Sequence, residues 1–154
     1  MDFVNLFVKS DNTKVQFQLA DLAVIPNVPD LKKLPSFDFD INFDGAFIDK
    51  FIKAKNALSD VDTFTILTEK KELKIVLGYS NINSNRVVFV VDKAYDGEIK
   101  PISFSAKYLK EILTANKEAT SVVLKVSTQG ISHVEFKIDD FNAKYFLVEQ
   151  QLTA

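Results

Sequence analysis

One order of predicted elements occurs twice in this chain, and that duplication limits the folds it can adopt. Residues 102–148 contain a short apolar strand, an amphipathic helical stretch and three more strand patterns. The same order is found over residues 37–91. Two βαβββ repeats of this kind are expected to form antiparallel sheet with two helices on one face, which is an α+β fold.

Helical periodicity supports the repeat. Apolar residues recur at three- and four-residue spacing in both stretches, as in amphipathic helices: Phe47, Ile48, Phe51, Ile52 and Leu58, then Tyr108, Leu109, Ile112 and Leu113. Asp44 and Ser105 precede these stretches, and both residue types are preferred N-caps. An offset of 61 positions superimposes the helices and also places Leu73 on Val134, Ile75 on Phe136 and Leu77 on Ile138.

The residues before the first repeat predict a hairpin and a connector. Residues 3–8 and 15–19 are apolar runs separated by turn-forming residues. In the second run Val15, Phe17 and Leu19 alternate with glutamines, a pattern typical of a strand with one buried face. Prolines at 26, 29 and 35 then predict an extended, irregular segment, because proline removes a hydrogen-bond donor and fixes φ.

Both helical stretches carry lysines opposite their apolar stripes. The polar faces contain Asp49, Lys50 and Lys53, and Lys107, Lys110, Glu111 and Lys117. Five lysines and two acids give +3 in a chain of net charge −2, so the other residues sum to −5. Side by side, such helices would attract phosphates without reading sequence. The alternative is a solvated face, and the absence of interleaved aromatics argues against base stacking.

The other polar residues give no support to an enzyme. His133 is the only histidine, lies in a predicted strand and has no nucleophile linked to it by a motif, so we expect it to be structural. Asp38 and Asp40 share the outward face of a strand, and Asp139 and Asp140 predict a turn. The chain has no cysteine, which excludes thiolate metal sites, and no glycine-rich phosphate motif, so no cofactor or metal is predicted.

Two apolar strands, residues 15–19 and 86–91, need partners on both sides. If either lies at a sheet edge, it invites strand addition from another chain. The alternative, that both are paired within one sheet, is equally compatible with the sequence.

Four segments of the chain resemble the DNA sliding clamps: KYLKEILTANKEA, VVLKVSTQG, HVEFKIDDFNAKYFLVEQ and FQLADLAVIPNVPDLKKLPSFDFDINFDGAFIDKFIK. The pattern VEFKIDD followed by AKYFLVEQQ is similar to the end of the eukaryotic and archaeal clamp PCNA. The compact strands and loops look closer to the clamps of T-even-like bacteriophages. The likeness covers about residues 12–151 and lies in the ordered succession of elements.

The resemblance implies a domain organisation. A clamp subunit carries two such domains, and three subunits close head-to-tail into a ring whose hole is lined by helices. Residues 37–154 would then be the C-terminal clamp domain, 21–36 the interdomain connector and 1–20 the remnant hairpin of an N-terminal domain. Most of that first domain has no counterpart, so we expect either a truncated product, which we favour, or a shortened clamp relative.

The resemblance also implies site residues. Loose contacts with duplex phosphates would come from Lys50, Lys53, Lys107, Lys110 and Lys117. The subunit interface would pair the strand of Val15, Phe17 and Leu19 with the strand of Arg86, Val87, Phe89 and Val91, so self-association is expected. The partner-peptide pocket, for a DNA polymerase and a clamp loader, would contain Leu31, Leu34, Ile131, Phe146 and Val148.

The leading hypothesis is therefore a polymerase processivity factor, a homo-oligomeric tether on double-stranded DNA with no catalysis of its own. The second is a protein-interaction module that has the clamp fold but does not encircle DNA. A third and weaker one is a small enzyme that uses Asp38 and Asp40. We expect a cytoplasmic protein, in the host cytoplasm if a phage encodes it.

Overall fold

The computed structural model describes residues 5–27, 33–80, 82 and 85–151, and it divides into two compact units, Met1–Leu34 and Pro35–Ala154. The smaller unit contains an antiparallel hairpin and one 3-10 turn: β1 (Asn5–Ser10), β2 (Thr13–Gln18) and η1 (Leu22–Val24). The predicted hairpin is confirmed.

The larger unit contains ten elements in the predicted order, βαβββ followed by βαβββ. They are β3 (Phe39–Asn42), α1 (Gly45–Ala57), β4 (Thr63–Glu69), β5 (Glu72–Leu77), β6 (Val87–Ala94), β7 (Ile102–Ser105), α2 (Ala106–Ala115), β8 (Ser121–Ser127), β9 (Ile131–Ile138) and β10 (Phe141–Val148). Asp44 and Ser105 cap the helices as predicted, because their side chains accept from the amides of Phe47 and Tyr108. No helix in the described residues is long and apolar enough to cross a membrane.

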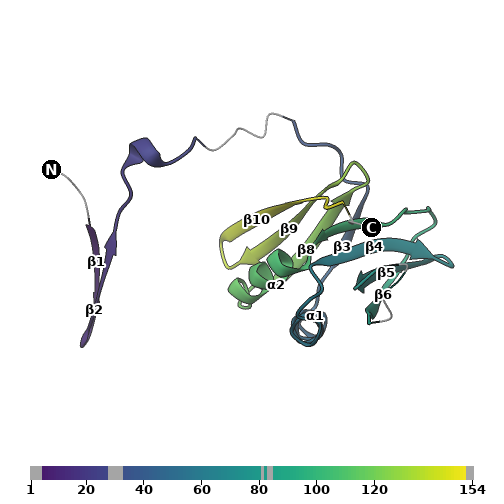
Figure 1. Ribbon diagram of the computed structural model, residues 1–154, viewed down its shortest axis with the longest axis horizontal. Coiled ribbons are helices and arrows are strands. Elements are labelled where there is room, and N and C mark those ends of the chain that lie inside the picture. The colour runs from purple at the N-terminus through teal and green to yellow at the C-terminus, as the bar shows by residue number, and fades with distance from the viewer. Residues whose placement is uncertain (1–4, 28–32, 81, 83–84, 152–154) are drawn as a thin grey trace. The chain divides into compact units, whose positions relative to one another are not determined.

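The two repeats exchange their first strands. The strands form two antiparallel four-stranded sheets, in the orders β10-β9-β8-β3 and β6-β5-β4-β7 (Figure 1). Strand β3 therefore pairs with β8 of the second repeat, and β7 pairs with β4 of the first. The sequence predicts antiparallel sheet beside two helices, but it does not predict that each sheet is built from both repeats.

The constant offset of 61 between the repeats is wrong beyond the helices. Helix α1 has 13 residues and α2 has 10, so the second repeat is three residues shorter at that point. Residues at equivalent places in the two sheets are Ile66 and Leu124, which oppose Ile102 and Ile41. Ile75 opposes Ile66 and Val134 opposes Leu124, so Ile75 corresponds to Val134 and not to Phe136.

Both helices lie on the same side of the sheets and contact each other (Figure 1). One core joins them to both sheets, with fully buried side chains that include Phe51, Phe64, Phe104, Leu109 and Phe136. The predicted stripe of α2 needs one correction, because Tyr108 is 60% exposed. The buried face of that helix is Ala106, Leu109 and Leu113, a spacing of three and four residues that turns Tyr108 away from the core.

Candidate nucleic-acid interface and assembly edges

The structure places all five predicted DNA-facing lysines on the two helices or just beyond them. Lys50 and Lys53 are exposed on α1, Lys107 is exposed and Lys110 half-buried on α2, and Lys117 is exposed after α2 ends. Of these five lysines, only Lys110 has a carboxylate within 4 Å among the described residues, that of Glu111 at 3.8 Å. The ammonium groups therefore remain available to an anion.

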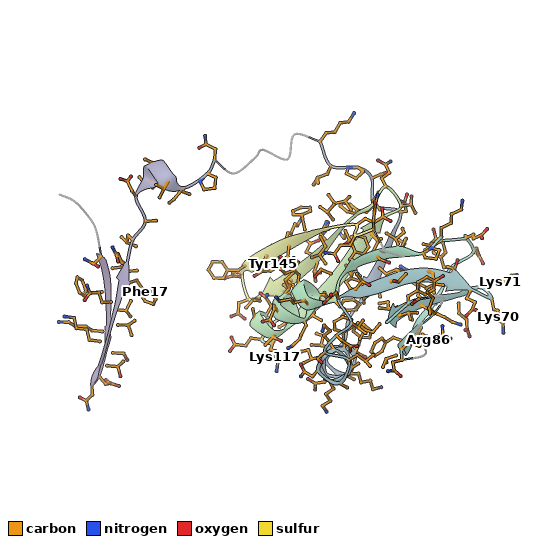
Figure 2. The ribbon with its side chains drawn as sticks, in the orientation of Figure 1. Phe17, Lys70, Lys71, Arg86, Lys117 and Tyr145 are labelled. Carbon is orange, nitrogen blue, oxygen red and sulfur yellow. The ribbon has the colours of Figure 1, made fainter. Side chains whose placement is uncertain are left out.

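Figure 2 shows how lysines are distributed over the larger unit. Lys117 lies beside α2, whereas Lys70 and Lys71 lie at the tip of the β4–β5 hairpin, away from both helices. The basic side chains are therefore not confined to the helical side, and a test of that side needs matched lysines from elsewhere as its control.

Four of the five predicted lysines border two separate grooves. Lys50 and Lys53 border a groove of about 930 Å³ between α1 and β6, whose floor includes Phe47, Phe89 and Val91. Lys107 and Lys110 border a smaller groove, of about 410 Å³, between the end of α1 and the start of α2. The first has an apolar floor and a rim of mixed charge, because Asp44 and Asp92 line it beside the lysines, and the second is polar.

Lys55, which sequence reasoning missed, lines the smaller groove. It lies in the last turn of α1, and only 7% of the residue is exposed. Its Nζ donates hydrogen bonds to the carbonyl oxygens of Leu58 (3.3 Å) and Ser59 (2.9 Å). Asn56, Ser59, Asp62 and Glu111 complete the lining. Four positions from Phe51, Lys55 continues the apolar stripe of α1, and that was the one signal of its burial.

Strand β6 forms one edge of its sheet and pairs only with β5. Val87, Phe89 and Val91 are half-buried on the side of the larger groove, while Val88 and Val90 are 46% and 59% exposed. Arg86 is exposed and immediately precedes the strand. The open edge that the sequence allowed is therefore present.

Strand β2 is likewise paired on one side only, with β1. Val15 opposes Val8 and Phe17 opposes Leu6, so these four side chains share one face of the hairpin. All four are exposed, between 39% and 53%, and Leu19 follows the strand and is 42% exposed. A hairpin of two strands is marginally stable in water by itself, and this face offers four apolar side chains to a further element.

Three of the five predicted peptide-pocket residues lie together on β9 and β10. Val148 opposes Ile131, and Phe146 opposes His133 on the same face. The His133 ring contacts Phe146 with a centroid distance of 5.3 Å and Phe37 at 4.5 Å. Leu34 belongs to the smaller unit, and Leu31 lies outside the described residues. Phe37 and His133 are neighbours of this surface that the resemblance did not identify.

His133 is buried, and that burial lowers the pKa of its imidazole, although the nearby Glu135 carboxylate favours the charged form. Its Nε2 lies 3.6 Å from a Glu135 oxygen, which is too long for a hydrogen bond. Neither ring nitrogen has a hydrogen-bond partner among the described residues. Burial raises the pKa of Glu135, but Lys125 and Lys144, at 3.2 and 3.5 Å, together lower it.

The carboxylates of the enzyme hypothesis bind separate partners. Asp38 accepts hydrogen bonds from the amide and hydroxyl of Thr128, at 2.7 and 2.8 Å, and these bonds lower its pKa. Asp40 forms an ion pair with Lys93 at 3.1 Å. Asp139 has a positive φ in the turn that the sequence predicted. No cluster of three or more potential metal ligands occurs among the described residues.

The fold is that of the sliding clamps. Similar solved structures are PCNA from Entamoeba histolytica (20% identity, TM-score 0.62) and A. fulgidus PCNA bound to the C-terminal region of FEN-1 (20%, 0.67). DNA polymerase III subunit beta from Borrelia burgdorferi, solved in complex with a natural product, is also similar (18%, 0.64). No protein-family model matches the sequence, and neither does any curated protein.

The likeness extends over most of this chain but over only part of each clamp. It covers 92%, 100% and 97% of this chain, in the order given above. It covers 57%, 63% and 39% of the corresponding clamp chains. The chain therefore spans less than two thirds of the structures that it resembles.

Proposed function

We propose that this chain is a sliding-clamp subunit, or a large part of one, that tethers a DNA polymerase to duplex DNA as a processivity factor without catalysis. One observation carries the proposal: two helices in contact expose lysines without strong ion pairs, in a chain whose net charge is −2. The opposite layer consists of two sheets, whose outermost strands include β6 and β10.

Contact with DNA would rest on charge alone. Ammonium groups on long side chains bind phosphate oxygens by displacing condensed counterions, which gives affinity without sequence readout. A duplex held in this way has no preferred register, so the protein can move along it while it remains bound. Tyr108, 60% exposed between Lys107 and Lys110, adds an aromatic group to this side, but paired bases in a duplex offer it no open stacking face.

Assembly would use the open strand edges. In this proposal the β6 edge of one copy, with Arg86, Val87, Phe89 and Val91, pairs with the β2 edge of another, with Val15, Phe17 and Leu19. Such head-to-tail contact is heterologous, and a heterologous contact produces a ring when its rotation closes. A trimer is the closed form expected from the clamp family, and a T-even-like phage clamp remains the form whose sequence pattern we consider most similar.

Partner proteins would bind on the outer face of β9 and β10. Ile131, Phe146 and Val148 give this surface apolar positions into which a polymerase or clamp loader could place hydrophobic anchors. The A. fulgidus structure shows a PCNA with a bound segment of FEN-1, so a protein with this fold can hold a peptide.

Charge reversal of Lys50, Lys53, Lys107 and Lys110 to Glu tests the proposal. We expect the variant to fold, because these side chains are not core residues, and to lose stimulation of the polymerase on circular primed DNA. The matched control reverses four exposed lysines elsewhere in the chain, Lys70, Lys71, Lys100 and Lys137, with the same change in net charge. Unchanged processivity in the first variant, with circular dichroism confirming its fold, would reject the tether.

The alternative is a protein-interaction module that does not encircle DNA. It is favoured by the apolar surface on β9 and β10, where Val148 opposes Ile131 and is 70% exposed. In that case Phe146→Ala or Ile131→Ala would abolish binding to partner proteins, while the four-lysine variant would bind them as well as the wild type does.

A further inference from the structure

Lys55 is the only lysine that is buried in the described part of the chain. Its two hydrogen-bond partners are the carbonyl oxygens of Leu58 and Ser59, which are neutral groups. No described carboxylate lies within 4 Å of its Nζ, so its charge is not paired. An ammonium group has three donors, and these two carbonyls use two of them.

A buried charge without a counterion is unfavourable. The carbonyl groups at the end of α1 compensate in part, because the C-terminus of a helix carries partial negative charge. That local role explains why a lysine is tolerated at this position. It does not explain why the side chain lines a groove shared with two further lysines, since capping needs only the end of its own helix.

The groove itself has the composition of an anion site. Lys55 enters it from α1, and Lys107 and Lys110 enter it from α2. Asn56 adds amide donors and Ser59 a hydroxyl. Two carboxylates, Asp62 and Glu111, also line it, so the lysines are in excess by one. Lys110 is only weakly held by Glu111, at 3.8 Å, and is therefore free to turn to another anion.

We propose that this groove binds a single phosphate group, with Lys55 as its buried anchor and Lys107 and Lys110 as outer ligands from the neighbouring helix. The inference rests on the proposed function, in which the phosphate belongs to a DNA backbone. It differs from loose contact by exposed lysines, because one phosphate would be held at a defined place between the helices. Free phosphate shares this chemistry and serves as the simplest probe.

The test is a titration of the ¹⁵N-labelled full chain with inorganic phosphate and, separately, with a short DNA duplex at fixed ionic strength. We expect the amide signals of residues 56–59 and 107–111 to shift with both probes. Lys55→Met should lower the affinity for the duplex about tenfold, as expected for loss of a charge-assisted hydrogen bond. When the duplex titration is repeated at several salt concentrations, Lys55→Met should also reduce the slope of log affinity against log salt by about 0.9.

Two variants control for simple loss of charge or of helix capping. Lys137→Met removes one exposed charge from β9, away from the proposed DNA-binding lysines, and should leave the response of residues 56–59 to phosphate intact. Lys55→Arg keeps both the cation and a donor to the carbonyls, and should retain most of the affinity. If Lys55→Met does not fold, the double variant Lys107→Met/Lys110→Met replaces it, because its side chains are not core residues.

The outcomes separate this inference from the proposed function. If the duplex shifts signals at Lys50, Lys53 and Lys117 but neither probe affects residues 56–59, the phosphate site is overturned and DNA binding stands. If inorganic phosphate shifts the groove signals but no duplex binds, the anion site stands and the DNA tether falls.

Discussion

Phe64 of β4 lies directly opposite Phe104 of β7, with the centroids of their rings 5.7 Å apart. Both side chains are fully buried. Because β4 belongs to the first repeat and β7 to the second, this pair joins the repeats through the core. The helices, which follow β3 and β7, take their positions from this junction and its counterpart between β3 and β8.

Truncation of Phe104 should therefore be costly. We expect Phe104→Ala to lower the free energy of unfolding by about 3–5 kcal/mol, the usual loss for a buried phenylalanine. Urea denaturation followed by circular dichroism measures it. Phe141→Ala is the control, because Phe141 is 77% exposed, and it should change stability by less than about 0.5 kcal/mol. Similar losses in both variants would contradict the central place of this pair.

A second prediction concerns the buried hydroxyls of Thr65 and Ser103, which lie 2.8 Å apart on the same two strands. Thr65→Val removes one partner and leaves the other unsatisfied, which should cost about 1–3 kcal/mol. The double variant Thr65→Val/Ser103→Ala removes both and should recover part of that loss. A double-mutant cycle of unfolding free energies gives the coupling directly, and a coupling near zero would mean that the bond contributes nothing.

A third prediction follows from the lowered pKa of His133. The native state favours the neutral ring, whereas the unfolded chain takes up a proton near its ordinary pKa of about 6.5. The free energy of unfolding should therefore fall as the pH drops below that value. The carboxyls with lowered pKa values, those of Asp38, Glu69 and Glu135, weaken the fold only at lower pH, when they become protonated.

Chemical denaturation at several pH values between about 7 and 5 separates the two effects. His133→Phe should flatten the curve over that interval, because it keeps a ring between Phe37 and Phe146 and cannot titrate. An unchanged slope in the variant would assign the pH dependence to other groups.

A fourth prediction concerns self-association through β6. A lysine on an open edge opposes strand addition, so Val88→Lys/Val90→Lys should dissociate any oligomer, with little loss of stability because both side chains are exposed. Sedimentation velocity measures the assembly state. Val148→Lys, on the terminal strand of the other sheet, is the matched control, and dissociation by it alone would place the interface on β10.

Local patterns predicted the local structure. The cap residues Asp44 and Ser105 report on interactions within a few positions, and both helices begin where these residues predict. The exchange of β3 and β7 was not predictable in this way. The apolar residues of a strand show that one of its faces is buried, but they do not show which other strand it pairs with. Helix lengths that differ by three residues also defeated a single offset.

The candidate site was predicted in part for a similar reason. Helical spacing places Lys50, Lys53 and Lys107 outside the apolar stripe, and they are exposed. Lys55 also follows that spacing, but a lysine in an apolar stripe is ordinarily taken as a chain end reaching solvent. Its burial depends on the carbonyls of Leu58 and Ser59 and on the position of α2, which only the folded chain brings together.

The exchanged strands have a consequence for motion. Because each repeat supplies a strand to the sheet of the other, local unfolding of one repeat also breaks strand pairing in the other. Amide hydrogen exchange in β4, β7, β3 and β8 should therefore occur through a single cooperative opening of both repeats. The distance between residues on α1 and residues on α2 should then stay the same until the whole unit unfolds. We therefore expect the two helices, which contact each other, to move as one body, with the larger motions in their long exposed side chains.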